Sequence, residues 1–203
     1  MSDKGLGVVV LQEYWGLVPH IEQVCDRFAC EGFTAMAPDL FQGEVAGDPD
    51  DAATLMQALN IKTTEAILRK AILQLLAHPA VSSQKVGIVG FCMGGQLSLL
   101  AATINPAIGA CVDYYGIHPN VRPVLRDLHC PMIGFFAERD DYASPEAVKA
   151  LDEQLTILGK PHEFITYPNT DHAFFNDHRP EVYNEAAAKD SWLRMLKFFR
   201  DNL

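Results

Sequence analysis

Short, continuous apolar runs alternate along the chain with longer segments in which apolar residues recur every three or four positions. Such runs are typical of strands buried on both faces, whereas the longer spacing is typical of helices with one buried side. The apolar runs predict six strands, at residues 6–11, 33–37, 86–90, 108–114, 132–137 and 163–167. The helical spacing is found at residues 21–28, 52–78, 93–101 and 145–158, and in a last helix that starts at Pro180.

The segments between these elements carry the turn-forming residues. Residues 40–51 are expected to form an exposed loop and residues 115–127 a loop over the strand ends, while the 52–78 helix is expected to break near Asn60. Strands that alternate with helices indicate an α/β fold, with a mostly parallel sheet covered on both faces. The 203 residues, 49% of them hydrophobic, suit a single domain spanning residues 1–203.

Composition narrows the class of protein further. A formal net charge of −10 argues against a nucleic acid or an anionic membrane as partner, because both require a basic face. No apolar run reaches about 18 residues, so no membrane-spanning helix is expected. The first residues lack the plan of a signal peptide. The five cysteines include no Cys-x-x-Cys pair, which favours a reduced, cytoplasmic protein without disulfides, metal site or cofactor.

Residues 90–96 read Gly-Phe-Cys-Met-Gly-Gly-Gln and join a predicted strand to a predicted helix. Gly-x-Cys-x-Gly at such a junction is the pattern of a nucleophile elbow, with cysteine where serine is commoner. The glycines leave room for neighbouring backbone in a strained turn. The free N–H groups at the start of the helix favour both a thiolate and a developing oxyanion. Cys92 is therefore the candidate nucleophile.

Three further polar residues follow predicted strands: Glu13, Asp140 and His172. Ligands of a parallel sheet bind beyond the carboxyl ends of its strands, so these side chains are expected to meet Cys92 there. A cysteine nucleophile needs a base, and the base needs an acid that orients it. The order nucleophile, acid, histidine is that of the α/β-hydrolases. By spacing alone, Asp141 competes with Asp140 as the acid.

Five short motifs make the chain similar to the dienelactone hydrolase family. They are Gln-Glu at residues 12–13, Pro-Asp-Leu-Phe at 38–41, Gly-Phe-Cys-Met-Gly-Gly at 90–95, Asp-Tyr-Tyr-Gly at 113–116 and Thr-Asp-His-Ala-Phe at 170–174. The resemblance implies an α/β-hydrolase fold, here with shortened N-terminal strands. It also implies an enzyme that cleaves a small ester or lactone through a cysteine nucleophile and a thioester intermediate.

The same resemblance implies roles for individual residues. Cys92, Asp140 and His172 would form the catalytic triad, with Asp140 rather than Asp141 at the position of the family's acid. Glu13 would hold the resting thiol and release it when substrate arrives. The backbone N–H groups of Met93 and Tyr14 would form the oxyanion hole.

The chain departs from the family at the residues that hold the substrate's carboxylate. Family members that hydrolyse dienelactone use two arginines, but no arginine lies between Arg27 and Arg69 here, and Asn176 stands four residues after His172. Neutral, hydrophobic esters or lactones are therefore expected to be better substrates than dienelactone, unless a loop arginine, Arg122 or Arg126, replaces the lost pair. Aromatic residues of the strand-end loops are expected to line an apolar pocket: Tyr14, Trp15, Phe41, Tyr115 and Phe174.

Two other functions fit part of the pattern. A glutamine amidotransferase has an elbow that reads Gly-x-Cys-x-Gly-x-Gln, but its histidine precedes a glutamate by two residues, and no His-x-Glu occurs here. A non-enzymatic thiol sensor would use Cys92 poised by Glu13 and would need no partner histidine. The histidines that compete with His172 for the role of base are His118, His129 and His178.

Overall fold

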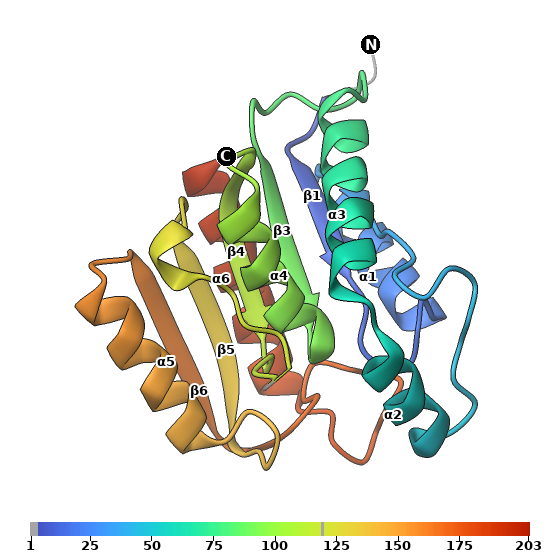
Figure 1. Ribbon diagram of the computed structural model, residues 1–203, viewed down its shortest axis with the longest axis vertical. Helices are drawn as coiled ribbons and strands as arrows, with labels where there is room; N and C mark the ends of the chain where they lie inside the picture. The colour runs from blue at the N-terminus through green and yellow to red at the C-terminus, as the bar shows by residue number, and fades with distance from the viewer. Residues whose placement is uncertain (1–3, 119) are drawn as a thin grey trace.

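The computed structural model describes residues 4–118 and 120–203 (Figure 1). Its elements follow one another in the order β1 (Gly7–Leu11), α1 (Pro19–Cys30), β2 (Thr34–Met36), α2 (Pro49–Ala58), α3 (Ile61–Leu76), β3 (Val86–Phe91), α4 (Met93–Ile104), β4 (Ile108–Tyr114), η1 (Leu125–Asp127), β5 (Met132–Arg139), α5 (Pro145–Ile157), β6 (His162–Asp171) and α6 (Glu185–Asn202). Strands and helices alternate as the hydrophobic pattern predicts.

The strands form one six-stranded, fully parallel sheet in the order β2-β1-β3-β4-β5-β6. The chain adds β2 on one side of β1 and then crosses to place β3 on the other side. The strand order therefore reverses between β1 and β3, and such a switch point is where an open parallel sheet binds its ligand. Leu11 at the end of β1 pairs with Gly90 near the end of β3, so the loops after both strands start side by side.

Helices cover both faces of the sheet, with α3 and α4 in front of it and α6 behind it in Figure 1. The alternation of side chains in β1 shows why both faces are apolar. Val8 and Val10 belong to the hydrophobic cluster beneath α1 and α6, and Val9 and Leu11 to the cluster beneath α3 and α4. A strand buried on both faces has no polar positions, which explains its continuous apolar run.

Three local predictions are refined by the structure. The break near Asn60 is confirmed, since the side chain of Asn60 accepts a hydrogen bond from Thr63 N (3.1 Å) and caps α3. The expectation of an exposed loop at residues 40–51 is wrong in part: Leu40 and Phe41 are buried, and α2 already begins at Pro49. Leu40 N donates to the side chain of Gln12 (3.0 Å), which pulls this loop onto the end of β1.

The last helix does not start at Pro180. Residues 180–183 form turns, in which Tyr183 N donates to the carbonyl of Arg179 (3.0 Å), and α6 begins only at Glu185. Its N-cap is Asn184, whose side chain accepts a hydrogen bond from Ala187 N (3.1 Å). Asparagine is a strong N-cap, and this signal outweighs the preference of proline for a first helical turn.

No helix in the described part of the chain is both long and apolar enough to cross a lipid bilayer.

Candidate active site

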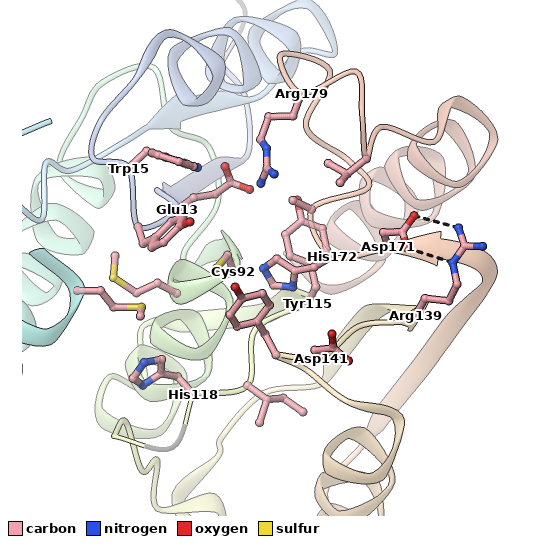
Figure 2. A pocket seen from close by; sticks show the side chains of 17 residues that line it. Glu13, Trp15, Cys92, Tyr115, His118, Arg139, Asp141, Asp171, His172 and Arg179 are labelled. Carbon is pink, nitrogen blue, oxygen red and sulfur yellow. Dashed lines mark hydrogen bonds and ion pairs between the residues drawn. The ribbon is translucent and has the colours of Figure 1, made fainter. Parts of the chain in front are cut away.

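A cavity of about 590 Å³ opens beyond the carboxyl ends of the strands. Glu13, Cys92, Tyr115 and His172, which follow β1, β3, β4 and β6 respectively, all contribute to its wall (Figure 2). Asp141, from the loop after β5, lies at its rim. The parallel sheet thus gathers at one edge the loops that the sequence predicted to meet.

The turn at Cys92 has the geometry of a nucleophile elbow. Cys92 has φ 54° and ψ −119°, a conformation that L-residues rarely adopt, and its N–H donates to the carbonyl of Tyr114 (2.9 Å). The turn is tight because a Cβ on Gly90 would collide with the carbonyl of Gly94, and one on Gly94 with that of Gln12. The strain holds the sulfur out of the strand and above the start of α4, half-buried in the cavity wall.

The His172 ring is oriented by Asp140. His172 Nδ1 lies 2.8 Å from Asp140 Oδ2, while the other carboxylate oxygen accepts the N–H groups of Tyr142 (2.8 Å) and Ala143 (2.9 Å). Asp140 is fully buried at its side chain. Of the two acids that spacing left open, Asp140 contacts the histidine, whereas Asp141 is an exposed residue of the cavity rim.

The surroundings of His172 favour its protonated form. Burial lowers its pKa, but hydrogen bonds to Asp140 and Cys92 and the negative charge of both outweigh burial and raise the pKa to about 10. The rings of Tyr115 and Tyr142 flank the imidazole, with centroids at 5.0 and 4.9 Å. His172 can therefore carry a proton beside the Cys92 sulfur, an arrangement that stabilises a thiolate.

Glu13 is a buried carboxylate in the wall of the same cavity. Asn176 Nδ2 donates to Glu13 Oε2 (2.8 Å), and only 2% of the residue is exposed. Burial raises the pKa of Glu13 above its ordinary value, although Asn176, His172, Arg179 and Tyr115 act to lower it. A carboxylate with a raised pKa accepts a proton more readily, which suits a group in the wall of the cavity that Cys92 also lines.

Only part of the expected aromatic lining is present. Tyr14, Trp15 and Tyr115 line the cavity, as predicted. Phe41 instead belongs to a separate groove beside α2 and α3, because its loop folds back onto α3. Phe174 is fully buried and packs on Tyr115 from within the core (centroids 5.3 Å apart). The two phenylalanines therefore do not reach a ligand in this cavity.

The candidate oxyanion-hole residues, Met93 and Tyr14, both line the cavity. Met93 is the first residue of α4, so its N–H belongs to the helical turn that has no acceptor within the helix. Tyr14 follows β1 across the switch point. Among the rival histidines, His118 lines the cavity, whereas His129 and His178 do not.

Sequence reasoning missed several cavity residues. Arg179 lies in the wall, and Figure 2 shows its guanidinium directed toward Glu13. Arg139 also reaches the cavity, but it is paired with Asp171 (2.9 Å). Neither Arg122 nor Arg126 is among the lining residues. The cavity therefore contains two arginines, Arg139 and Arg179, neither of which lies at the family positions that are empty here.

A parallel sheet with an elbow after β3 and a bonded Asp–His pair after β5 and β6 defines an α/β-hydrolase. The comparisons with known proteins give the family within that class. The model of the dienelactone hydrolase family matches residues 1–203, and the chain belongs to that family.

Individual relatives agree with this assignment. The chain is 34% identical to "Protein usf" of Aquifex pyrophilus over 98% of this chain and 89% of that protein. It is 36% identical to a "Putative carboxymethylenebutenolidase" of Salmonella typhi, over 98% of this chain and 78% of that protein. The crystal structure of a "Putative Dienelactone Hydrolase" from Klebsiella pneumoniae superposes with a TM-score of 0.89 at 30% identity, covering 98% and 88% of the two chains. The protein is accordingly a hydrolase of carboxylic esters or lactones.

Proposed function

We propose that this hydrolase cleaves its ester or lactone with Cys92 as nucleophile, through a thioester intermediate. The single observation that carries the proposal is the hydrogen bond between His172 Nδ1 and Asp140 Oδ2 (2.8 Å), beside a cysteine held at φ 54°. A buried acid that orients a histidine next to a strained, accessible thiol is the arrangement that nucleophilic catalysis requires.

The raised pKa values suggest how protons move during acylation. Glu13 takes the thiol proton as the Cys92 sulfur forms a bond to the carbonyl carbon, and the oxygen becomes an oxyanion near the N–H groups of Met93 and Tyr14. The tetrahedral species then breaks its bond to the alcohol oxygen, which takes a proton from protonated His172. The alcohol leaves, and Cys92 carries the acyl group as a thioester.

Hydrolysis of the thioester returns every group to its starting state. Neutral His172 takes a proton from water, whose oxygen attacks the thioester carbon. The second tetrahedral species expels the Cys92 thiolate, which recovers the proton from Glu13, and the acid product leaves. One water is consumed for each ester bond broken, and Asp140 keeps the imidazole oriented and stabilises its charge in both steps.

The first test replaces the nucleophile. We expect Cys92→Ala to lower kcat/KM for aryl esters and enol lactones at least a thousandfold while the circular dichroism spectrum stays unchanged, because the sulfur is only half-buried. Cys92→Ser should retain little activity, since an alcohol is far harder to deprotonate than a thiol. Rapid-quench mass spectrometry of the wild type should find one acyl group on Cys92. Full activity in Cys92→Ala would end the proposal.

The lining of the cavity suggests the substrate. Its wall is mostly apolar and aromatic, with Trp15, Tyr115 and Tyr142 among its residues, and the guanidinium of Arg179 points inward. This pattern suits a small ester or lactone with an apolar body and a single acidic group. This proposal differs from the expectation of neutral substrates, which rested on the two empty arginine positions of the family.

The thiol-sensor reading makes a different prediction for His172→Gln. If the protein is a thiol sensor, peroxide should still oxidise Cys92 in this variant, because a sensor needs no base. The hydrolase proposed here should instead lose turnover, and the family assignment supports the hydrolase.

A further inference from the structure

A second group of chemically active side chains lies outside the cavity, where the start of α1 meets the segment after β6. His20 is the second residue of α1, and Asp177 and His178 follow β6. One ligand atom from each of the three lies within 4.8 Å of the other two. The hydrolysis proposed above uses none of them.

The spacing within this group resembles that of a metal site. His20 Nδ1 lies 3.3 Å from Asp177 Oδ1. Two ligands of a tetrahedral ion with bonds of about 2.0–2.1 Å are themselves about 3.3 Å apart. The rings of His20 and His178 are inclined at 60° with centroids 5.5 Å apart, so the two imidazoles are direct neighbours.

Burial makes His20 an unusual member of a surface group. Its side chain is 2% exposed, and its Nε2 has no hydrogen-bond partner among the described residues. Its Nδ1 is the nitrogen that faces Asp177, so Nδ1 is the ligand atom that His20 offers, and Nε2 carries the ring proton when an ion is bound. Asp177 and His178 are exposed, which leaves an approach for an ion from solvent.

The ring of His178 is already oriented by a neighbour. His178 Nε2 lies 2.9 Å from Gln23 Oε1, on the next turn of α1. The amide oxygen only accepts hydrogen bonds, so Nε2 carries the proton and Nδ1 keeps its lone pair. A metal-binding histidine commonly donates its other ring N–H in this way, which fixes its tautomer.

We propose that His20, Asp177 and His178 bind a divalent transition-metal ion such as Zn²⁺, with water at the open position. Two imidazoles and one carboxylate suit this class of ion, whereas Mg²⁺ and Ca²⁺ prefer oxygen ligands throughout. The sequence did not reveal the site, because His20 and the other two residues lie near opposite ends of the chain.

Such an ion would brace the segment that supports the active site. His178 N donates to Asn176 Oδ1 (3.0 Å), and Asn176 Nδ2 in turn donates to Glu13 (2.8 Å). The same turn holds Arg179, whose N–H donates to the carbonyl of Asn176 (3.0 Å). The metal would therefore tie α1 to the turn that positions Asn176 and Arg179.

The test measures Zn²⁺ binding to the full chain in a Cys30→Ala, Cys92→Ala background, which removes the exposed thiol and the cavity thiol as competing ligands. After treatment with EDTA, titration against a chromophoric chelator should show one Zn²⁺ per chain. His178→Gln and Asp177→Asn should each weaken this binding at least tenfold. His129→Gln removes an exposed histidine elsewhere and should leave the affinity unchanged.

Two further measurements distinguish a specific metal site from nonspecific binding. Co²⁺ should give visible absorption bands that are lost in His178→Gln, and Zn²⁺ should raise the Tm of the parent but not of Asp177→Asn. Both replaced side chains are exposed, so circular dichroism should report folded variants. The absence of stoichiometric binding, or an affinity that neither variant changes, would overturn the proposal and leave His20 and Asp177 as a structural pair.

Discussion

At Cys92, the strained backbone and the neighbouring ionisable groups both affect the sulfur atom. The residue is held at positive φ, its sulfur faces a histidine with a raised pKa, and a buried carboxyl group lies in the same wall. Glu13 and His172 thus present one candidate proton acceptor and one proton donor to a single thiol. Groups whose surroundings move their pKa values away from the ordinary range are typical of catalytic sites.

Replacing Glu13 tests whether its carboxylate accepts a hydrogen bond from the Cys92 thiol in the free enzyme. Glu13→Gln keeps the shape of the side chain but removes a buried negative charge that opposes the thiolate. We expect alkylation of Cys92 by iodoacetamide at pH 7 to become several-fold faster, and its pH midpoint to fall. Asp141→Asn, at the cavity rim, is the matched control and should change little. An identical pH profile in wild type and Glu13→Gln would give Glu13 a structural role instead.

A second residue-scale prediction concerns Asp113, which lies beneath the elbow helix. The residue is fully buried, one carboxylate oxygen accepts Gly116 N (2.8 Å), and the other has no partner among the described residues. Burial raises its pKa well above the ordinary value of 3.8. A raised pKa in the folded state contributes stability below pH 3.8, and this contribution is lost as pH rises toward the folded pKa.

Asp113→Asn should remove that dependence on pH. The amide keeps the acceptor for Gly116 and needs no proton, so its unfolding free energy relative to wild type should increase with pH. The slope approaches about 1.4 kcal/mol per pH unit above the unfolded pKa. Urea unfolding at several pH values measures it, with the exposed Asp127→Asn as control. A difference independent of pH would show that Asp113 is ionised in the folded protein.

At the scale of elements, the loops that follow the strands hold the candidate catalytic residues. Where the next helix begins decides how long each of these loops is. β6 runs to Asp171 and delivers His172 directly at its end, and the following residues turn through Ala173 at φ 66°. The segment then continues to Asn184, where α6 begins. Because α6 starts late, residues 173–184 lie outside the helix, and part of this segment lines the cavity.

Asn184→Ala tests this boundary. Loss of an asparagine N-cap typically costs about 1 kcal/mol. For a protein of this size, that corresponds to a fall in Tm of about 2–4 °C. Thermal unfolding should show this fall, whereas Asn120→Ala, at an exposed loop position, should leave Tm nearly unchanged. An unaffected Tm in Asn184→Ala would mean that the cap contributes nothing to α6.

At the scale of the whole molecule, a chain with a net charge of −10 places an inward-facing arginine in the cavity that Cys92 lines. Arg179 bonds to the exposed Glu181 (2.9 Å), and a third of its side chain is accessible. Arg139 is paired with Asp171 and directed along the rim. Arg179 is therefore the arginine that an acidic substrate, as proposed above, would meet in this cavity, near the protonated His172.

Substrate choice tests the role of Arg179. A charge-assisted hydrogen bond is worth about 1.5–3 kcal/mol, and partial exposure places this one at the lower end, or about tenfold in kcat/KM. We expect a carboxylated lactone to be hydrolysed about tenfold better than its methyl ester, and Arg179→Gln to abolish the preference. Arg139→Gln should preserve it. A wild-type preference for the methyl ester would restore the expectation drawn from the sequence alone.

Much of the fold could be predicted because its signals are local. The six apolar runs identify the strands, and Asn60 and Pro145 mark helix starts at which they are found. Proline at residue 180 was misleading, because the start of α6 depends on the Asn184 cap and on the hydrogen bond from Asn184 N to the carbonyl of Phe174 (3.0 Å).

By itself, the sequence determined the elbow and the gathering of Cys92 and His172, since Gly90 and Gly94 allow the tight turn and parallel strands place the following loops at one edge. Only the tertiary structure decided which loop side chains face the cavity. The side chain of Phe174 packs in the core, while that of Arg179 lines the cavity. Loop directions of this kind depend on bonds between residues distant in the chain, such as Asn176 with Glu13, and no local pattern encodes such pairs.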